Sequence, residues 1–293
     1  LIERGCVVVP LVASVAARRD ALLAVSQANV SITISGADSH EISSIHRTPD
    51  HPLYRELRDR QHPGLVIFSS GSSGESKAAV HDAVRMLERF RVRRRRIRTI
   101  AFLLFDHIGG INTMLYALSN GGTLVVVPDR SPDSVLAAIE RHSVELLPTS
   151  PTFINLILLS DAYRRHDLSS LNTVTYGTEP MPDTTLRRFT EIAPRVKMQQ
   201  SYGLSELGIL RSRSRDSRST WVKIGGDGVQ TRVANGILQV RTDSAMLGYL
   251  NAESPFTDDG WFDTGDLVTQ DGEFIQIHGR QSELINVGGE KVH

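Results

Sequence analysis

The residues best suited to chemistry form a short serine- and glycine-rich run that ends at a lysine. The run reads SSGSSGESK, spans residues 69–77 and directly follows the apolar stretch LVIF. Glycines let backbone N–H groups turn toward an anion, serine hydroxyls add hydrogen-bond donors, and the ammonium group of Lys77 adds positive charge. A run of this kind therefore has the chemistry to hold the phosphates of a nucleotide.

Three interpretations of this run are open from the residues alone. A kinase-type phosphate loop requires G-x-x-x-x-G-K-[ST], and counting from Gly71 the sixth position is Ser76, so that pattern fails. A flexible linker suits the composition, but the run is flanked closely by a strand pattern and an amphipathic stretch. The third interpretation is a variant phosphate loop between a strand and a helix, which predicts a helix over Lys77–Phe90.

The pattern around this run predicts the class of fold. Short β-branched runs alternate with amphipathic stretches from residue 7 to about residue 200, which is typical of an α/β fold with its strands covered on both faces. The expected strands are Val7–Val9, Ser31–Ile34, Leu65–Ser69, Thr99–Leu104, Thr123–Val127, Glu145–Leu147, Thr173–Tyr176 and Arg195–Gln199. The expected helices are Val12–Gln27, Lys77–Phe90, Ile111–Leu118, Asp133–His142, Thr152–Leu159 and Pro182–Ile192.

The pattern of apolar and polar residues changes after Gly208. Apolar and polar residues then alternate with a period of two, and turn signals occur at Asn235-Gly236 and Asp271-Gly272. Alternation of this period predicts strands with one buried face. A smaller β-rich unit is therefore expected over roughly residues 225–280.

Composition and charge limit the class of protein. Of the 293 residues, 40% are hydrophobic and 23% charged, and 33 basic residues balance 33 acidic ones, so no global field favours nucleic acid. No apolar run is long enough to span a membrane, the first residues do not resemble a signal peptide, and Cys6 is alone. These features predict a cytoplasmic protein. Both ends fall inside ordered patterns, which predicts a fragment of a longer protein.

One charge run, RFRVRRRRIR over residues 89–98, has two interpretations. It is either a solvated helix end that leads into the next strand, or a surface that meets the phosphates of a second substrate or an acidic partner.

Eight segments together resemble the adenylate-forming superfamily of acyl- and aryl-CoA ligases, peptide-synthetase adenylation domains and luciferases. The run SSGSSGESK is similar to the phosphate loop of that superfamily, with Ser76 replacing its proline and Ala78 its final glycine. The other segments follow in the family's order: RGCVVVPL, FDHIGGIN, TYGTEPMP, QSYGLSE, GILQVRTDSAMLGYLN, GWFDTGDL and GRQSELINVGGEKV. The order across nearly the whole chain makes the resemblance far more specific than any one segment.

The resemblance implies an architecture. It predicts a layered αβα nucleotide- and acid-binding core over residues 1–224, a smaller barrel-like β-rich subdomain over residues 225–280, and a hinge over residues 281–293, with Glu283 at the acidic hinge position. It also implies a mobile C-terminal domain that this chain lacks, with a catalytic lysine beyond His293.

The resemblance also implies a reaction. ATP and Mg²⁺ would activate a small carboxylic acid as an acyl-adenylate with release of pyrophosphate, and the acyl group would pass to the thiol of coenzyme A or of a carrier protein's phosphopantetheine. An acyl carrier protein is then a possible partner. One alternative is an amino-acid adenylation domain of a peptide-synthetase-like system, which Asp106 favours, while HIGGIN and YGLSE favour a CoA ligase. The other is a nucleotide- or acyl-adenylate-binding module without turnover, which Ser76 and Ala78 favour.

Matching each motif assigns roles to individual residues. The nucleotide site would comprise Ser69, Ser70, Gly71, Ser72, Ser73, Gly74, Gly177, Thr178, Glu179, Tyr202, Asp266 and Arg280. Within it, the loop would grip the β- and γ-phosphates, Tyr202 would stack on adenine opposite residues 177–179, and Asp266 would accept hydrogen bonds from the ribose hydroxyls. Arg280 would meet the ribose or a phosphate.

The remaining roles concern catalysis and the acid. The catalytic residues would be Lys77, Ser205, Glu206 and His107, with Ser205 at the α-phosphate and Glu206 holding Mg²⁺. The acid would lie against Asp106, His107, Gly109 and Gly110. Plain structural interpretations stay open beside these: Glu206 as a helix-start carboxylate, Tyr202 as a half-buried strand aromatic, Asp266 as a turn residue and His107 as a core histidine.

Overall fold

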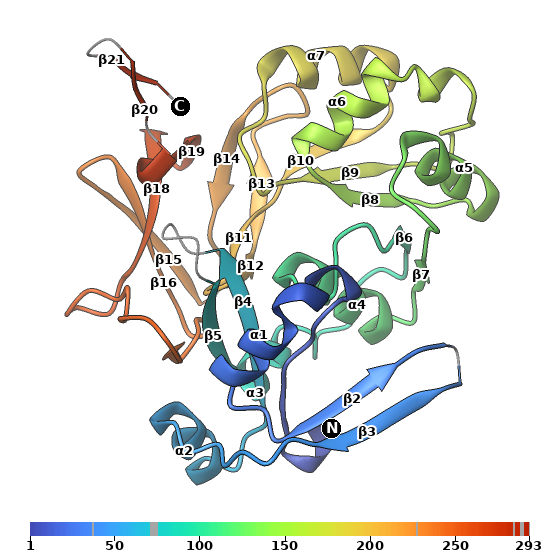
Figure 1. Ribbon diagram of the computed structural model, residues 1–293. Helices are drawn as coiled ribbons and strands as arrows, with labels where there is room; N and C mark the ends of the chain where they lie inside the picture. The colour runs from blue at the N-terminus through green and yellow to red at the C-terminus, as the bar shows by residue number, and fades with distance from the viewer. Residues whose placement is uncertain (37, 71–75, 227, 284, 288–289, 293) are drawn as a thin grey trace.

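The computed structural model describes residues 1–36, 38–70, 76–226, 228–283, 285–287 and 290–292, with the backbone alone for Ser70 and for residues from 283 onward. The fold is built on a four-stranded, a five-stranded and a six-stranded sheet. In Figure 1 the five-stranded sheet lies with its helices at the upper right, the four-stranded sheet lies below it, and the six-stranded sheet forms the left side.

The four-stranded sheet joins segments from both ends of the chain. Its order is β1 (Val7–Val8), β4 (Gly64–Ser70), β5 (Ser76–Asp82) and β17 (Gly248–Tyr249). β1 runs parallel to β4, whereas β4–β5 and β5–β17 are antiparallel. Around it lie η1 (Ile2–Arg4), η2 (Ala13–Arg18), α1 (Arg19–Val25), α2 (Pro52–Asp59), α3 (Ala83–Glu88) and the hairpin of β2 (Val30–Ile34) and β3 (His40–Ser44).

The five-stranded sheet is parallel throughout, which confirms the predicted α/β alternation. Its order is β10 (Lys197–Gln200), β9 (Thr173–Tyr176), β8 (Leu146–Thr149), β6 (Arg98–Ile100) and β7 (Thr123–Val125). The connecting helices are α4 (Ile108–Ser119), α5 (Pro132–His142), α6 (Pro151–Leu159), η3 (Ala162–Arg164) and α7 (Asp183–Ile192). The largest hydrophobic cluster, which includes Leu136, Leu147, Ile154 and Leu186, joins these strands to their helices.

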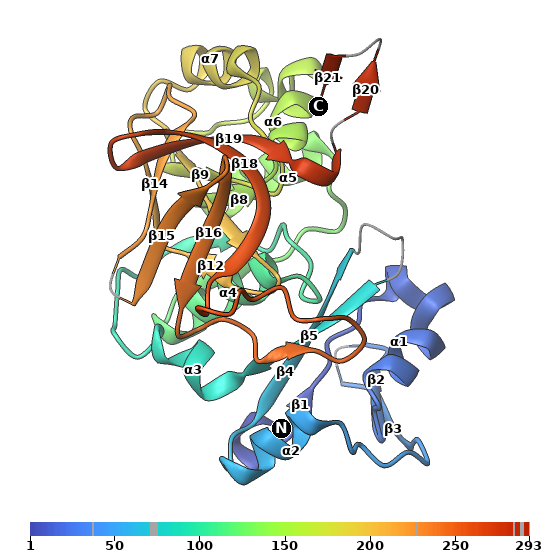
Figure 2. The ribbon, with the colours of Figure 1, turned by 90° about the vertical axis from the view of Figure 1, so that its left-hand side faces the viewer.

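The six-stranded sheet is antiparallel and curled (Figure 2). Its order is β13 (Ser212–Ser214), β14 (Trp221–Ile224), β19 (Phe274–Arg280), β18 (Phe262–Asp271), β16 (Ile237–Thr242) and β15 (Val229–Ala234). Asn235 and Gly236 both have positive φ, at 52° and 79°, as the tightest hairpin turns require. β13 and β14 precede residue 225 yet belong to this sheet. The predicted boundary between the core and the β-rich subdomain at that residue stays a prediction. The chain continues through η4 (Gln281–Glu283), β20 (Ile285–Val287) and β21 (Glu290–Val292).

The predicted helix over Lys77–Phe90 is wrong in its first half. Residues 76–82 form β5, and the serine–glycine run joins two antiparallel strands instead of a strand and a helix. The alanines and the valine of this strand are fully buried, because one face packs on the N-terminal core and the other on the C-terminal half. Burial on both faces overrides the helical propensity of alanine. The helix begins only after Asp82, whose carboxylate accepts hydrogen bonds from the N–H groups of Val84 and Arg85.

Other predicted elements differ at their limits. The segment Val12–Gln27 divides into η2 and α1, the strand predicted over Thr99–Leu104 ends at Ile100, and the helix predicted from Ile111 already begins at Ile108. α2 and β3 were not predicted. Pro52 at the first turn and the His51 side chain, which accepts from the Leu53 N–H, are the local signals that start α2.

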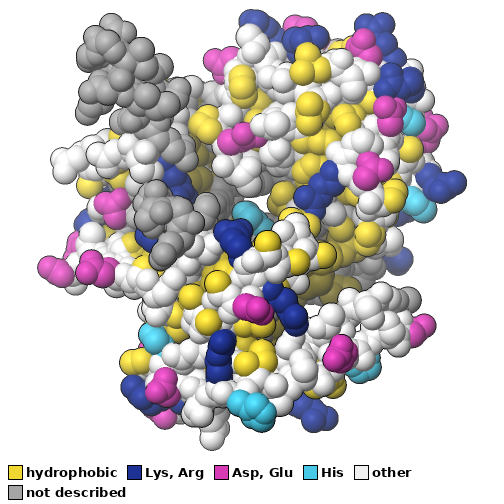
Figure 3. Space-filling view, viewed as in Figure 1, with side chains coloured by type: hydrophobic (Ala, Val, Ile, Leu, Met, Phe, Trp, Pro, Cys, Tyr) yellow, Lys and Arg dark blue, Asp and Glu magenta, His cyan; other side chains and the backbone are white. Residues whose placement is uncertain are grey.

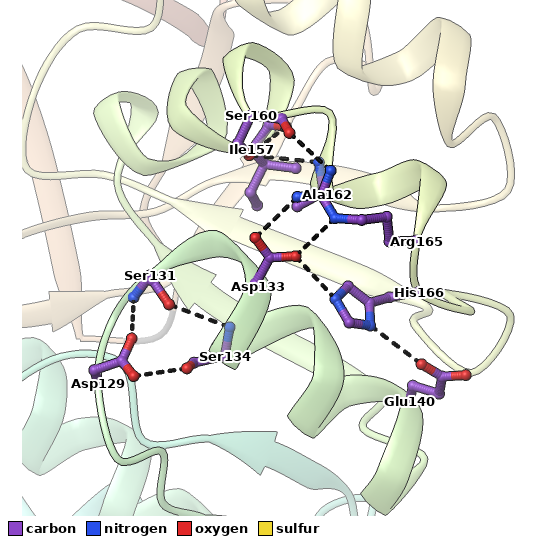
Figure 4. A network of polar contacts seen from close by, with 10 residues as sticks. All are labelled: Asp129, Ser131, Asp133, Ser134, Glu140, Ile157, Ser160, Ala162, Arg165 and His166. Atoms are coloured by element: carbon purple, nitrogen blue, oxygen red, sulfur yellow. Dashed lines mark hydrogen bonds and ion pairs between the residues drawn. The ribbon is translucent and has the colours of Figure 1, made fainter.

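Charged side chains lie on the outside of this framework. Basic and acidic groups intermingle over the face shown in Figure 3, in keeping with the balanced net charge. On α5, Asp133 accepts hydrogen bonds from Arg165 at 3.0 and 2.8 Å, and His166 lies between Asp133 and Glu140 at 3.2 and 3.3 Å (Figure 4). This network ties the outer helix α5 to the connection that follows α6.

Candidate functional site

A tight hairpin places three of the predicted site residues. β11 (Tyr202–Leu204) pairs with β12 (Gly208–Leu210), and Ser205 and Glu206 lie in the turn that joins them. Gly208 has φ of 77°, a left-handed conformation that lets the chain return. Glu206 is only 7% exposed and lies between two strands. Its interpretation as a helix-start carboxylate is therefore wrong.

The Glu206 carboxylate receives two hydroxyl hydrogen bonds from distant parts of the chain. Ser69, at the start of the serine–glycine run, donates to Oε1 at 3.1 Å, and Tyr249 of β17 donates to the same oxygen at 2.6 Å. Burial, followed by the charge of Glu206, raises the pKa of Tyr249, so its hydroxyl stays a donor at neutral pH. The tertiary structure thus brings the predicted phosphate run and the predicted metal ligand together.

Lys77 points toward the same place from β5. Its Nζ lies 5.5 Å from the centre of the Tyr249 ring, within range of a cation–π interaction. The side-chain amide of Asn251 donates to the Ser76 carbonyl at 2.9 Å and accepts from the Ala78 N–H at 2.9 Å. Because these two bonds bracket Lys77 on both sides, Asn251 fixes the backbone from which the lysine extends.

A second tyrosine–carboxylate pair joins two residues of the predicted nucleotide site. The Tyr202 hydroxyl donates to Asp266 Oδ2 at 2.6 Å, and Arg280 Nε lies 3.5 Å from Oδ1. Asp266 is 6% exposed within strand β18, and Tyr202 is equally buried. Their interpretations as a turn residue and a half-buried aromatic are therefore wrong. The charge of Arg280 also lowers the pKa of Tyr249, against the larger effect of burial. Arg280 therefore interacts electrostatically with both tyrosine–carboxylate pairs.

The predicted adenine segment begins where β9 ends. Gly177 packs against the chain next to Tyr202, since a Cβ there would lie 2.8 Å from the Ser201 carbonyl oxygen. Thr178 has φ of 76°, and Glu179 Oε1 accepts a hydrogen bond from the Thr152 N–H at 2.7 Å. Glu179 thereby satisfies an otherwise unpaired N–H at the start of α6. These contacts place Gly177 beside the Tyr202 hairpin and Glu179 at the start of α6.

The predicted acid-binding residues lie at the start of α4. His107 caps this helix, with Nδ1 accepting from the Gly109 N–H at 3.3 Å, and α4 packs against β12 through Ile111 and Ile209. The His107 side chain keeps solvent exposure, which argues against a core histidine. Partial desolvation of the ring nevertheless lowers the pKa of His107, and the charge of Asp106 opposes this effect. No hydrogen bond or ion pair between described residues joins His107 to Glu206 or Lys77.

The glycine pair that follows has a packing requirement of its own. A Cβ on Gly109 would meet the Leu103 side chain at 2.6 Å, and one on Gly110 would lie 2.0 Å from the Leu104 carbonyl oxygen. Both glycines are buried against the preceding turn. Close backbone approach accounts for Gly110 and contact with the Leu103 side chain for Gly109, so their contact with an acid stays a prediction.

Several predicted residues lie outside the described part of the structure. Gly71, Ser72, Ser73 and Gly74 fall in the undescribed segment 71–75, and only the backbone is described for Ser70 and Glu283.

Three neighbours of the site were not predicted. Tyr249 and Asn251 lie within the segment GILQVRTDSAMLGYLN, whose resemblance to the family could have pointed to them. His81 of β5 is 1% exposed and contacts the Ser205 carbonyl oxygen at 2.6 Å. It lies four residues after Lys77, hence on the same face of the strand. That spacing becomes a signal only once the segment is known to be a strand.

The chemistry of Glu206 fits a shared Mg²⁺ ion. Among the described residues both hydroxyl donors contact Oε1 and none contacts Oε2, which leaves a carboxylate oxygen of the kind that Mg²⁺ prefers. The described residues hold no group of three or more metal-ligating side chains. One carboxylate together with substrate phosphates is the usual way in which proteins bind this ion.

The family model for AMP-binding enzymes matches residues 3–250. The chain belongs to the AMP-binding enzyme family. This AMP-binding chain is 28% identical to 4-coumarate–CoA ligase-like 2 of Arabidopsis thaliana, over 85% of this chain and 49% of that protein. It is 29% identical to indoleacetate–CoA ligase of Aromatoleum aromaticum, over 96% of this chain and 60% of that protein. The AMP-binding chain therefore spans about half the length of the curated relatives it matches.

A solved structure supports the fold. ATP-bound MatB from Rhodopseudomonas palustris superposes with a TM-score of 0.65 at 24% identity, covering 78% of the AMP-binding chain and 50% of MatB. This likeness confirms the predicted α/β core with a smaller β-rich subdomain, which the structure shows as a curled antiparallel sheet. In the described part of the AMP-binding chain, no helix has both the length and the apolar character needed to cross a membrane.

Proposed function

We propose that the full-length protein uses ATP to activate a small carboxylic acid as an acyl-adenylate and then transfers the acyl group to a thiol. A carboxylate oxygen attacks the α-phosphorus of ATP, and the bond from that phosphorus to the bridging oxygen of pyrophosphate breaks. A thiol sulfur then attacks the acyl carbon, AMP leaves, and the thiol proton passes to solvent. The thiol belongs to coenzyme A or to a carrier protein's phosphopantetheine. The names of the CoA-ligase relatives support this class of reaction.

The observation that carries the proposal is the meeting of Ser69, Lys77 and Glu206 around Tyr249. In-line displacement at phosphorus requires that the three phosphates be held in place and their negative charge neutralised. An ammonium group, hydroxyl donors and a carboxylate-bound Mg²⁺ can do this together. Mg²⁺, when bound, supplies Lewis-acid stabilisation of the phosphate oxygens. Glu206 Oε2 would hold this ion, and the Ser205 hydroxyl would meet the α-phosphate.

The nucleoside would lie on the side of the second tyrosine–carboxylate pair. Asp266 has two oxygens that suit the two ribose hydroxyls, Arg280 adds a charge at the same carboxylate, and Gly177 lies beside the Tyr202 hairpin. The acid would approach from the start of α4, where Asp106 and His107 retain solvent exposure. In this proposal the nucleotide and the acid contact different elements of the fold.

The test is acid-dependent exchange of radiolabelled pyrophosphate into ATP by the full-length protein. A panel of aliphatic, aryl and amino acids is supplied one at a time, and we expect exchange with one chemical class and none without acid. An amino-acid response would favour a peptide-synthetase-like adenylation domain. ATP binding without exchange for any acid would instead favour a binding module and contradict the proposed reaction.

A further inference from the structure

His81 is a buried histidine whose contacts are poorly explained by stability alone. Its ring is 1% exposed on β5, and Nε2 lies 2.6 Å from the Ser205 carbonyl oxygen. Because a carbonyl oxygen only accepts, Nε2 carries the hydrogen and Nδ1 is left as an acceptor. No described residue donates to Nδ1. Burying an acceptor without a partner is costly, so an apolar side chain would suit this position better if packing were its only purpose.

The one hydrogen bond of the ring is aimed at the proposed reaction centre. Ser205 and Glu206 share the peptide unit whose carbonyl His81 holds, and they form the turn of the β11–β12 hairpin. Burial lowers the pKa of His81, although the bond to Ser205 and the charge of Glu206 oppose that effect. The ring is therefore neutral at physiological pH and acts as a fixed donor.

β5 couples this donor to the phosphate side of the site. Successive side chains of a strand alternate between its faces, so Lys77, Ala79 and His81 share one face. Ala79 belongs to the hydrophobic cluster that also contains Tyr202 and Leu204, which shows that this face is directed at the β11–β12 hairpin. One strand thus carries both the ammonium group and the donor that fixes the turn.

We propose that His81 is a positioning residue for the adenylation reaction, holding Ser205 and Glu206 at a fixed distance from Lys77 through the Ser205 carbonyl. The inference rests on the proposed function, because it assigns His81 a part in placing the metal ligand and the α-phosphate donor. In this proposal His81 acts through the Ser205 carbonyl and makes no contact of its own with substrate or metal. A loss of its hydrogen bond should therefore affect the use of ATP and leave the acid-binding residues of α4 undisturbed.

Two substitutions separate positioning from packing. His81→Met keeps a similar volume but removes the donor, whereas His81→Gln places an amide N–H close to the position of Nε2. In the pyrophosphate-exchange assay with the full-length protein, we expect His81→Met to raise the apparent KM for ATP about tenfold, the loss typical of one buried hydrogen bond. The KM for the acid should change less than twofold, and His81→Gln should restore the KM for ATP to within about threefold of the wild-type value.

Stability measurements complete the test. The melting temperature of His81→Met should lie near that of the wild type, because losing the Ser205 bond and removing the unpartnered Nδ1 have opposite effects. Val135→Ala, in the buried face of α5, serves as a control that lowers stability without touching the site. It should leave the KM for ATP unchanged. The positioning role is overturned if His81→Met raises the KM for ATP and the KM for the acid equally. It is also overturned if the KM for ATP is as high in His81→Gln as in His81→Met.

The failure of the proposed function would be recognised separately. If the wild type catalyses no exchange with any acid, that reaction is wrong, and the dissociation constant of Mg²⁺–ATP measured by calorimetry takes the place of KM. A tenfold rise of this dissociation constant in His81→Met, with recovery in His81→Gln, then supports the positioning role. The same dissociation constant in the wild type and in His81→Met overturns it. A wild-type protein that binds no ATP overturns both proposals.

Discussion

Carboxylates occur in two contrasting settings, the interior of the candidate site and the rim of α5. Inside, Glu206 and Asp266 are 7% and 6% exposed, and each accepts a 2.6 Å hydrogen bond from a tyrosine hydroxyl. On the rim, Asp133 contacts both an arginine and a histidine, but its side chain is 55% exposed. The arginine and histidine partners lower the pKa of the rim carboxylate, chiefly through the hydrogen bond from Arg165.

The comparison teaches that burial decides the consequence of a polar contact more than the number of partners does. Water screens the charges around Asp133 and competes for each of its hydrogen bonds. Around Glu206 and Asp266 little water remains, so each contact is electrostatically stronger and each lost partner leaves a buried group unsatisfied. We therefore expect substitutions in the interior to have large effects and those on the rim to have small ones.

The largest effect is expected for Glu206→Gln in the full-length protein. The substitution keeps the size of the side chain and removes its charge. If Glu206 holds a cation shared with the phosphates, that cation loses its anionic protein ligand. Acid-dependent pyrophosphate exchange should fall by about two to three orders of magnitude, the scale of losing a preorganised electrostatic group. Exchange within tenfold of the wild-type rate would show that Glu206 does not hold the metal.

A smaller but clear effect is expected for Asp266→Ala. If its carboxylate binds the ribose, losing a charge-assisted hydrogen bond should weaken ATP binding by about one to two decades, as measured by calorimetry. Asp263→Asn is the matched control, because Asp263 lies on the same strand but is exposed. The circular dichroism of both variants should match the wild type. An unchanged ATP affinity in Asp266→Ala would give this buried carboxylate a structural role alone.

Lys77→Ala should produce a selective effect. The ammonium group lies at the end of the serine–glycine run, so its loss should weaken ATP and pyrophosphate binding more than binding of the acyl-adenylate, which lacks the β- and γ-phosphates. A sulfamoyl analogue, whose sulfamoyl group stands in for the α-phosphate, serves as the third ligand in calorimetry. Equally weakened binding of all three ligands would mean that Lys77 supports the fold. Unchanged binding of all three would favour the interpretation of the run as a linker.

The smallest effect is expected on the rim. Asp133→Asn removes the charge that faces Arg165 and His166, yet the melting temperature should change by no more than about 2 °C, because exposed ion pairs contribute little. The difference from the wild type should shrink further in high salt. A change as large as that of a buried substitution would contradict the contrast between the two settings.

The site could be predicted in its residue types but not in its contacts. The Ser69–Glu206 and Tyr202–Asp266 contacts join residues 137 and 64 positions apart, and the motifs alone predicted both ends of each pair. Tyr249 contacts Glu206 from 43 positions away, and although its segment resembles a family motif, nothing near it in the sequence indicates this contact. Side chains meet here because strands from three segments converge, which is a property of the whole fold.

Local sequence by itself determined the alternation of strands and helices over residues 7–200 and the hairpin turn at Asn235-Gly236. Both depend on periodicity and on turn residues, which act within a few positions along the chain. Only the tertiary structure decided that residues 76–82 form a strand. Alanine, valine and lysine carry no local signal strong enough to select a strand, and burial between two hydrophobic clusters supplies the free energy that does. That same burial sets Lys77 and His81 on one face, beside the turn that carries Ser205 and Glu206.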